Sequence, residues 1–199
     1  MRGNTTENII LASASPRRRE LIERLGLTFT VIPAKSELSA EPGEAPELSV
    51  VRIAKAKAEE IAAGSNDLRL IISADTIVVI DGKILGKPAD ADDAANMLAE
   101  LSSKTHEVIT AVTLLKNGGA LEFTERTFVT FREITPAEIN AYVSSGEPLD
   151  KAGAYGIQGL GGMFIERIDG DYYNVVGLPI CALSIALKRF GIDLTENWS

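Results

Sequence analysis

The chain has 199 residues, of which 45% are hydrophobic and 24% are charged, and its formal net charge is -8. This composition is typical of a globular protein with one sizeable core, and the acidic balance argues against a general binder of nucleic acid or of membrane surfaces. One cysteine and one histidine exclude an internal disulfide, argue against a Cys/His zinc site and fit a reducing compartment.

The first residues of the chain predict a strand, a helix and a second strand. The apolar run at residues 9–12 predicts a short buried strand. Ser15 is a good helix cap and Pro16 suits the first helical position, so a helix is expected from here to just before Gly26. Residues 29–33 then predict the second strand.

The next segment predicts a loop, a long helix and a central strand. Residues 36–46 are rich in Pro, Gly and Glu, and residues 48–63 predict a helix. The apolar stripe of this helix is expected to contain Val51, Ala54, Ala58 and Ile61. Residues 70–80 (LIISADTIVVI) are apolar on both faces, as in a central strand, and Asp81-Gly82 predicts a two-residue hairpin turn.

Helices and strands continue to alternate in the second half. We expect a helix over residues 90–101 and strands over residues 107–115 and 123–131. Residues 135–138 (TPAE) form a capping-box pattern that predicts a helix ending at Gly146.

The last part of the chain contains a glycine-rich stretch at residues 153–162. Residues 163–176 predict a second strand-Asp-Gly-strand unit, and a final helix is expected from about Pro179 to Gly191. Because two hairpins interrupt the alternation of helices and strands, we predict an α/β fold with a mixed, twisted sheet flanked by helices.

Three consecutive arginines follow Pro16, at the end of a helix where the macrodipole is already positive. Arg18 lies near the centre of the buried stripe, Arg17 lies at its shoulder, and Arg19 faces outward, where Glu23 can pair with it. A buried arginine needs a partner. Two partners are compatible with the sequence: a bound phosphate, or one of the 28 acidic side chains of the chain.

Asp75 interrupts an otherwise apolar strand. Its carboxylate must be functional, bound to a metal, or paired with a lysine or arginine. Lys57 lies at the edge of its helix's apolar stripe, where most lysines extend their ammonium group to water. Lys87 belongs to GKILGK, which lacks the spacing and the Ser/Thr of a phosphate-binding loop. Its ammonium group can still contact phosphate as a point charge.

The segment KAGAYGIQG at residues 151–159 is too rich in glycine for a helix or a strand interior. Taken alone it predicts a turn, although the amide of Gln158 is suited to reading the edge of a base. The following glycines do not form a dinucleotide fingerprint, because the order of strand, glycines and helix is wrong. His106 begins a predicted strand and is expected to have a structural role.

Together these segments resemble the Maf family of nucleoside triphosphate pyrophosphatases. The matching motifs are LASASPRRRELIERLGL, ADTIV, ILGKP, EPLDKAGAYGIQG and GDYYNVVGLPI, spread from about residue 9 to residue 191. The resemblance implies one domain over residues 1–199, with two lobes, a deep cleft and a fold related to inosine triphosphate pyrophosphatases. It also implies hydrolysis of a nucleoside triphosphate to the monophosphate and pyrophosphate, assisted by Mg2+ or Mn2+.

The resemblance also implies roles for single residues. The AGAYGIQG segment is similar to the family branch that acts on dTTP and UTP, whereas the 7-methyl-GTP branch has a different sequence there. Asp75 would accept a proton. The implied triphosphate-binding residues are Ser13, Arg17, Arg18, Lys57 and Lys87, and the implied base-selecting residues are Arg17, Thr76 and Gln158. The family often has two adjacent acids after its second strand; here Leu38 replaces the second, which leaves Glu37 to bind metal with Asp75.

The sequence leaves several functions open. A dTTP/UTP pyrophosphatase, acting on canonical or modified pyrimidine nucleotides, would clear the nucleotide pool. The alternatives are a 7-methyl-GTP pyrophosphatase, a phosphatase that releases orthophosphate, and a nucleotide-binding regulator without catalysis, since the family name is associated with septum formation and division arrest. The resemblance implies a homodimer. We expect a cytoplasmic protein that binds neither nucleic acid nor membrane, because the chain is acidic and no signal peptide or long apolar run is evident.

Overall fold

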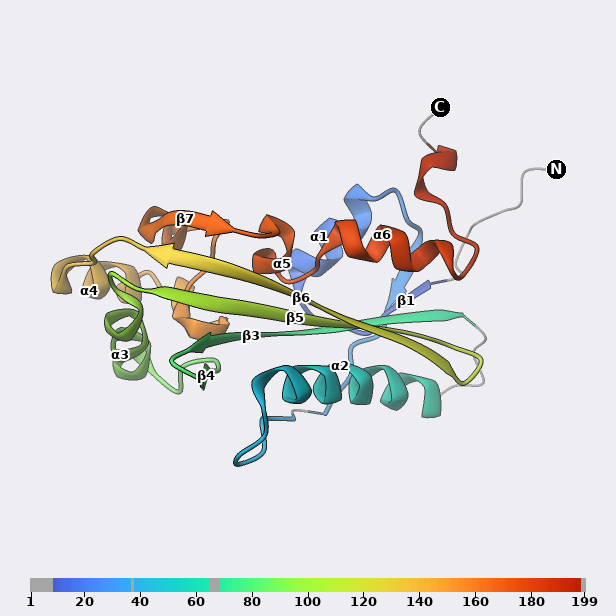
Figure 1. Ribbon diagram of the computed structural model, residues 1–199, viewed down its shortest axis with the longest axis horizontal. Coiled ribbons are helices and arrows are strands. Elements are labelled where there is room, and N and C mark those ends of the chain that lie inside the picture. The colour runs from blue at the N-terminus through green and yellow to red at the C-terminus, as the bar shows by residue number, and fades with distance from the viewer. Residues whose placement is uncertain (1–8, 37, 65–68, 198–199) are drawn as a thin grey trace. The chain divides into compact units, whose positions relative to one another are not determined.

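The computed structural model describes residues 9–36, 38–64 and 69–197 (Figure 1). These residues form a seven-stranded sheet of order β2-β1-β3-β5-β6-β7, with β4 added to β3. The strands are β1 Ile9–Leu11, β2 Phe29–Val31, β3 Leu70–Ile80, β4 Lys83–Leu85, β5 Thr105–Lys116, β6 Gly119–Phe131 and β7 Ile165–Asp169. β1 pairs in parallel with β2 and β3, whereas β3–β4 and β6–β7 are antiparallel. The predicted mixed α/β sheet is therefore confirmed.

Helices flank this sheet and short 3-10 turns follow the fourth helix and end the chain. The α-helices are α1 Pro16–Arg24, α2 Pro46–Ala63, α3 Ala91–Leu101, α4 Pro136–Ser144, α5 Tyr172–Val176 and α6 Ile180–Lys188. The 3-10 turns are η1 Glu147–Asp150, η2 Ala152–Ala154, η3 Leu160–Phe164 and η4 Leu194–Asn197. Among the described residues, no helix is both long enough and apolar enough to cross a membrane.

The chain divides into two compact units. Unit 1 comprises Met1–Asp75, Ala111–Thr124 and Gly177–Ser199, and unit 2 comprises Thr76–Thr110 and Glu125–Val176. The boundary between the units falls within strands β3, β5 and β6. Each unit has a hydrophobic core of its own.

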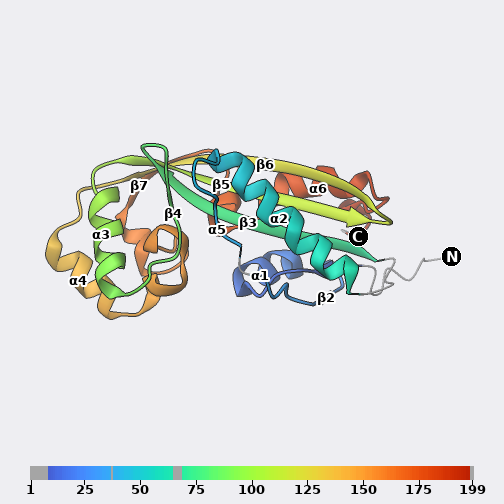
Figure 2. The same ribbon diagram turned by 90° about the horizontal axis from the view of Figure 1, so that it is seen from below.

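In unit 1, α2 covers one face of the sheet, and α1 and α6 lie over the other face (Figure 1, Figure 2). The core between α2 and the sheet contains Ile10, Ala12, Ala58, Ile61, Ile71 and Leu115. The stripe predicted for α2 is correct except at Val51, which is only half-buried, whereas Val50 is fully buried. Val50 lies one turn before Ala54 at the centre of the stripe, and Val51 lies at its edge.

The core of unit 2 contains a group of aromatic rings around a buried histidine. Nε2 of His106 lies 2.7 Å from the hydroxyl of Tyr155, and both side chains are almost fully buried. The ring of Phe131 meets each of them edge to face, at centroid distances of 4.9 and 4.8 Å. The structural role expected for His106 is therefore what the structure shows.

Two local signals in unit 2 produce the predicted geometry. Asp81 and Gly82 have φ angles of 49° and 78°, and Ile80 faces Lys83 across the β3–β4 hairpin, as the Asp-Gly turn predicted. The capping box of α4 is also present, since Thr135 and Glu138 exchange side-chain to backbone hydrogen bonds.

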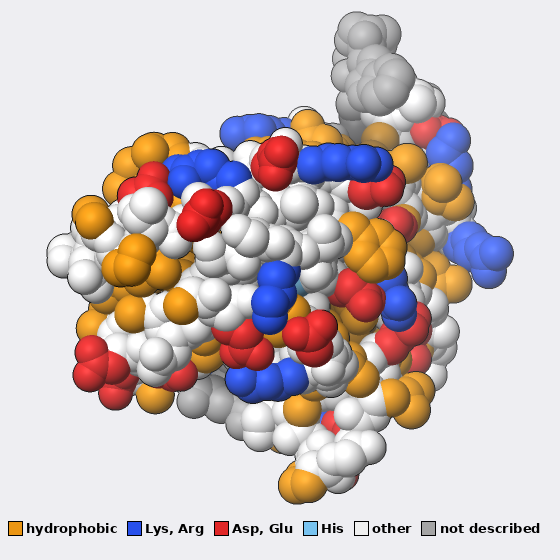
Figure 3. All heavy atoms as spheres, turned by 60° about the vertical axis from the view of Figure 1, so that its left-hand side comes forward, with side chains coloured by type: hydrophobic (Ala, Val, Ile, Leu, Met, Phe, Trp, Pro, Cys, Tyr) orange, Lys and Arg blue, Asp and Glu red, His pale blue; other side chains and the backbone are white. Residues whose placement is uncertain are grey.

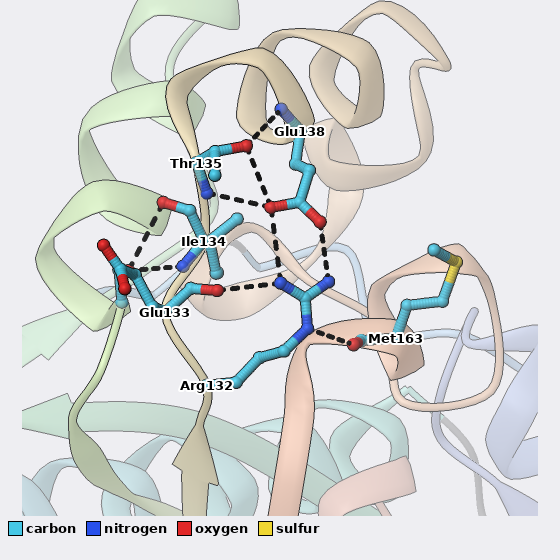
Figure 4. A network of polar contacts seen from close by, with 7 residues as sticks. Arg132, Glu133, Ile134, Thr135, Glu138 and Met163 are labelled. Carbon is cyan, nitrogen blue, oxygen red and sulfur yellow. Dashed lines mark hydrogen bonds and ion pairs between the residues drawn. The ribbon is translucent and has the colours of Figure 1, made fainter.

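An arginine that sequence analysis did not single out extends this cap. Both guanidinium Nη groups of Arg132 donate to the Glu138 carboxylate, at 3.3 and 2.8 Å (Figure 4). Its Nε donates to the carbonyl of Met163 in η3, at 3.1 Å. One side chain thus connects the end of β6 to α4 and η3.

The second strand-Asp-Gly-strand prediction is wrong in its second half. β7 pairs with β6 as a strand, but residues 172–176 form the helix α5. Asp171 starts this helical turn, because its carboxylate accepts a hydrogen bond from the Tyr173 N–H at 2.7 Å. Asn174 is buried and donates to the Val108 carbonyl and to Thr127 Oγ1, so the segment is tied inward and forms no second strand.

We expect the stability of the protein to fall in mild acid because of His106. Burial lowers the pKa of His106 from 6.5 to about 4, so between these values the unfolded chain holds the extra proton. This group alone therefore costs up to about 3 kcal/mol of unfolding free energy as the pH falls through that window.

Urea unfolding of the wild type and of His106→Gln at pH 7, 6, 5 and 4.5 measures this effect. Glutamine reaches the Tyr155 hydroxyl but does not titrate, so the variant should lose this part of the pH dependence. An identical slope in both proteins would contradict the assignment.

Candidate functional site

An ion pair in unit 1 joins two of the residues singled out in the sequence. Nζ of Lys57, on α2, lies 2.6 Å from Oδ1 of Asp75, on β3. Only 22% and 18% of the two side chains are exposed, so water screens the pair weakly. Of the alternatives for Asp75, the paired one is present, and Lys57 points at a carboxylate rather than to bulk water.

A second contact between the same two elements fixes this geometry. The buried hydroxyl of Ser73 donates to the Ala54 carbonyl at 2.6 Å. Ser73 and Asp75 are alternate residues of β3 and therefore point to the same face, while Ala54 and Lys57 are one turn apart on α2. The hydrogen bond thus sets the register in which the lysine meets the carboxylate.

Arg18 points into unit 1 from the first turn of α1. Ser15 caps the helix by accepting a hydrogen bond from the Arg18 N–H at 3.4 Å. The guanidinium donates from Nε to the Gly177 carbonyl at 2.7 Å, and from Nη1 to the Ala74 carbonyl at 2.9 Å. The partners predicted for Arg18 from the sequence were charged groups. The Gly177 and Ala74 carbonyl oxygens are neutral, so burial of the cation does not by itself demand a phosphate.

Ser13 completes this group at the end of β1. It is 7% exposed, and its Oγ accepts hydrogen bonds from the Ser15 N–H at 3.2 Å and from Arg18 Nη1 at 3.3 Å. Because β1 and β3 are parallel and Leu11 faces Ile72, Ser13 comes level with Ala74, next to Asp75. The carboxyl ends of parallel strands are where α/β proteins commonly place ligands.

The electrostatics of this group favour an anion. Burial lowers the pKa of Arg18, the Asp75 carboxylate raises it, and the Arg17 cation lowers it. Arg18 therefore senses both neighbours, and Lys57 pairs with the same carboxylate. Lys57 and Arg18 thus both interact with the Asp75 carboxylate, and the Arg17 cation acts on Arg18, in a chain whose net charge is -8. This local excess of positive charge can attract a polyanionic ligand that the acidic protein as a whole would repel.

The face of the molecule drawn in Figure 3 is mixed in charge. On this face, lysine and arginine side chains alternate with aspartate and glutamate, without a broad area of one sign. Arg19 is an example of such a surface charge, since it pairs with Glu23 at 2.9 Å as predicted.

The other site residues predicted in described parts of the chain lie on separate elements of unit 2. Thr76 Oγ1 is 2.9 Å from Thr110 Oγ1, which donates to the Asn174 carbonyl at 3.1 Å. Lys87 is exposed and makes no ion pair with any described residue. Gln158 is exposed in the turn between η2 and η3. Glu37, the second predicted metal ligand, lies outside the described residues.

The donor set fits a metal ion only in a particular way. Within the described parts of the chain, no three His, Cys, Asp or Glu side chains gather into a possible metal site. Asp75 offers one carboxylate, part of which is taken by Lys57. Mg2+ commonly keeps several waters and uses one or two carboxylates together with substrate phosphates. The residues therefore fit a metal that arrives with a phosphate ligand, and do not form a cage for a resident ion.

Sequence reasoning missed the groups that position these side chains. The Gly177 and Ala74 carbonyls have no signature in the sequence, because every residue has a carbonyl. Ser73 did carry a signal, as a polar residue two positions before Asp75 on an apolar strand.

Comparison with known proteins finds relatives that cover nearly the whole chain. Residues 8–190 match the family described as Maf-like protein. A dTTP/UTP pyrophosphatase of Syntrophomonas wolfei is 51% identical over 189 residues, which cover 94% of this chain and all of that protein. A dTTP/UTP pyrophosphatase of Bacillus cereus is 47% identical over 194 residues, covering 98% and 95%. Among solved structures, the Staphylococcus aureus Ham1 protein matches with a TM-score of 0.43 and 12% identity, over 63% of this chain and 72% of that one.

The two neighbouring arginines of α1 should differ in their effect on stability. Arg18→Ala leaves the Gly177 and Ala74 carbonyls without their donor, and we expect a loss of about 2–4 kcal/mol of unfolding free energy. Arg19→Ala removes only an exposed ion pair and should cost less than about 0.5 kcal/mol. Urea unfolding at pH 7 measures both, and equal losses would show that the carbonyl contacts do not stabilise unit 1.

Proposed function

This chain belongs to the Maf family, and on that premise we propose that it hydrolyses dTTP and UTP to the nucleoside monophosphate and pyrophosphate. The observation that carries the proposal is the excess of cations beside one carboxylate in unit 1. A triphosphate supplies the negative charge that this group lacks. The matching relatives named dTTP/UTP pyrophosphatase support the choice of base.

We assign phosphate binding to Ser13, Arg17, Arg18 and Lys57, with Lys87 as a further point charge. The guanidinium groups suit phosphate because their planar donors match its oxygens. The hydrogen bonds to the Gly177 and Ala74 carbonyls hold the Arg18 guanidinium in one orientation before any ligand binds, so its positive charge is already in place. Lys57 is suited to lie between the Asp75 carboxylate and a phosphate, with each anion taking some of its three donors.

Asp75 is the proposed proton acceptor. A water molecule attacks the α-phosphorus, its oxygen forms the new bond there, and one of its protons passes to the Asp75 carboxylate. The bond from the α-phosphorus to the oxygen bridging to the β-phosphorus breaks, and pyrophosphate leaves with that oxygen. Lys57 holds the carboxylate in one position for this step, and the cations stabilise the charge that develops on the leaving group.

We further propose that the reaction uses Mg2+ or Mn2+. Asp75 and Glu37 would hold the ion together with phosphate oxygens and water, and the ion would neutralise phosphate charge. Glu37 is the single acid of the family's acidic pair, since Leu38 occupies the second place.

Base choice is assigned to Arg17, Thr76 and Gln158. Gln158 supports this role by its chemistry and its place, because a primary amide offers both a donor and an acceptor and its side chain is exposed on a turn. Together these three residues would favour the pyrimidine nucleotides dTTP and UTP.

The cellular setting follows from the same premise. We propose that the enzyme acts in the cytoplasm as a homodimer and removes canonical or modified pyrimidine triphosphates before they are used. The single cysteine, Cys181, is free and exposed, as is common for proteins of a reducing compartment. Light scattering of the purified protein tests the dimer.

Asp75→Asn should lower the rate of pyrophosphate release by about 10²- to 10⁴-fold, because amides do not accept the proton. The folded state should persist, since the change preserves shape. Asp81→Asn is the matched control: Asp81 lies on the same hairpin, its side chain is 79% exposed, and its φ of 49° suits asparagine. The control should keep full activity, and a folded Asp75→Asn with near-normal turnover would remove Asp75 from the mechanism.

Identification of products separates the alternatives that the sequence left open. The wild-type protein is incubated with dTTP, UTP, purine triphosphates and 7-methyl-GTP, with Mg2+, Mn2+ or a chelator. Pyrophosphate from dTTP and UTP, lost with the chelator, is expected. Orthophosphate would indicate a phosphatase, a preference for 7-methyl-GTP the other branch, and tight binding without products a regulator.

Gln158→Ala should erode the preference for pyrimidines more than it slows turnover of dTTP. Losing one amide contact to a base edge reduces discrimination by about 10-fold or less, because such contacts are worth roughly 0.5–1.5 kcal/mol. Ratios of kcat/KM for dTTP, UTP and GTP measure the change. An unaltered ranking of substrates would exclude Gln158 as the base reader.

A further inference from the structure

The carboxylate of Glu147 lies against the glycine-rich turn of unit 2. Its Oε2 accepts a hydrogen bond from the Leu160 N–H at 2.9 Å, and its Oε1 accepts one from the Gly161 N–H at 3.2 Å. Oε1 also accepts a hydrogen bond from the Tyr142 hydroxyl at 2.9 Å. Both carboxylate oxygens are therefore used, and two of the donors are backbone groups at the end of the turn.

Tyr142 carries the contact to the other end of the turn. Its hydroxyl oxygen accepts a hydrogen bond from the Gly156 N–H at 3.2 Å while its proton goes to Glu147. Between Gly156 and Leu160 lie only three residues, and the middle one is the exposed Gln158. The acid and the phenol thus hold both ends of a short loop that presents one amide side chain.

The glycines of this turn are required by how closely it approaches the two side chains. A Cβ on Gly159 would collide with the Glu147 carboxylate, and one on Gly161 would lie 2.6 Å from the Tyr142 hydroxyl. Such contacts are far shorter than real Cβ atoms make, so either the turn or the contacting side chain would have to shift, and the hydrogen bonds between them would be disturbed. The segment therefore has glycine at the positions that contact Glu147 and Tyr142, and it has the Gln158 amide at a position that contacts neither.

The residue that precedes the turn is anchored by contacts that do not involve Glu147 or Tyr142. Tyr155, directly before Gly156, is buried and hydrogen-bonded to His106.

The Glu147 carboxylate is also held in place electrostatically. Burial alone would raise its pKa, but the hydrogen bonds from Leu160, Gly161 and Tyr142, with the charge of Lys151, lower it overall. Glu147 thus favours the ionised form, which accepts all three hydrogen bonds.

We propose that Glu147, acting through Tyr142, is a positioning residue for base selection, because it holds the turn that orients the Gln158 amide. The inference rests on the proposed function, in which Gln158 reads the base. Glu147 contacts the turn and not the nucleotide. Its removal should therefore let Gln158 sample other orientations, which weakens discrimination between bases and leaves phosphate binding and chemistry intact.

Glu147→Gln tests the inference, because the amide keeps the size of the side chain but places an NH2 group among N–H donors. Losing one or both backbone contacts should lower the preference for dTTP over GTP by about 10-fold, the factor expected for roughly 1.4 kcal/mol. The kcat for dTTP should change less than about threefold, since loss of the charge leaves the Asp75 ion pair untouched. Tyr142→Phe, which breaks the link to Gly156, should lower the preference in the same direction.

Glu138→Gln is the matched control. Glu138 is likewise a unit 2 glutamate whose carboxylate accepts several hydrogen bonds, but its partners are Arg132 and the start of α4 (Figure 4). This control should lower stability without changing the preference for dTTP. A loss of preference in both variants would show a general effect of weakening unit 2 and would overturn the proposal.

Binding separates this inference from the proposed reaction. Affinities for non-hydrolysable analogues of dTTP and GTP are measured by calorimetry on the same variants. Hydrogen exchange of the Leu160 and Gly161 amides reports on their hydrogen bonds to Glu147. Selective binding that Glu147→Gln weakens by about the same 10-fold, with faster exchange at both amides, supports the inference even if no hydrolysis occurs. Unchanged selectivity in Glu147→Gln, or a wild type that does not distinguish the two analogues, overturns it.

Discussion

The arrangement of unit 1 depends on the hydrogen bonds of the Arg18 guanidinium. They connect α1 with the end of β1 at Ser13, with β3 at Ala74 and with the segment that enters α6 at Gly177. Hydrogen bonds with a charged donor are stronger than neutral ones, and burial strengthens them further. Because Ala74 directly precedes Asp75, the same bonds help to place the carboxylate. A cation at the positive end of a helix is tolerated here because carbonyl dipoles surround it.

The partnership of α2 with β3 adds the second element of the group. Ser73 and Asp75 are two residues apart on β3 and so lie on the same face of the strand. Their partners Ala54 and Lys57 are about one turn apart on α2 and so lie on the same side of the helix. Because only 22% and 18% of the lysine and aspartate side chains are exposed, water screens their interaction weakly. An acidic chain thereby keeps one local region of excess positive charge.

Unit 2 shows a different use of polar groups. Residues 156–159 of its glycine-rich turn belong to no strand or helix, and the Glu147 carboxylate and the Tyr142 hydroxyl accept hydrogen bonds from backbone N–H groups at the two ends of this turn. The glycines let the backbone approach Glu147 and Tyr142 closely, and Tyr155, which precedes the turn, packs against Phe131 in the aromatic core. In the proposed enzyme, cations and a proton acceptor would perform the chemistry, while Glu147 and Tyr142 would help to set which base is accepted by holding the turn that carries Gln158.

The sequence by itself determined the strands and helices whose signals are local: the Ser15 cap, the Asp81-Gly82 turn, the Thr135 capping box and the apolar run of β3. It also identified Asp75 and Arg18 as unusual, because a charge in an apolar pattern needs a partner. Only the tertiary structure decided which partners these are, and that residues 172–176 form a helix and not a strand. The physical reason is that carbonyls, and side chains distant in sequence such as Glu147 and Thr127, act through contacts that no local pattern encodes.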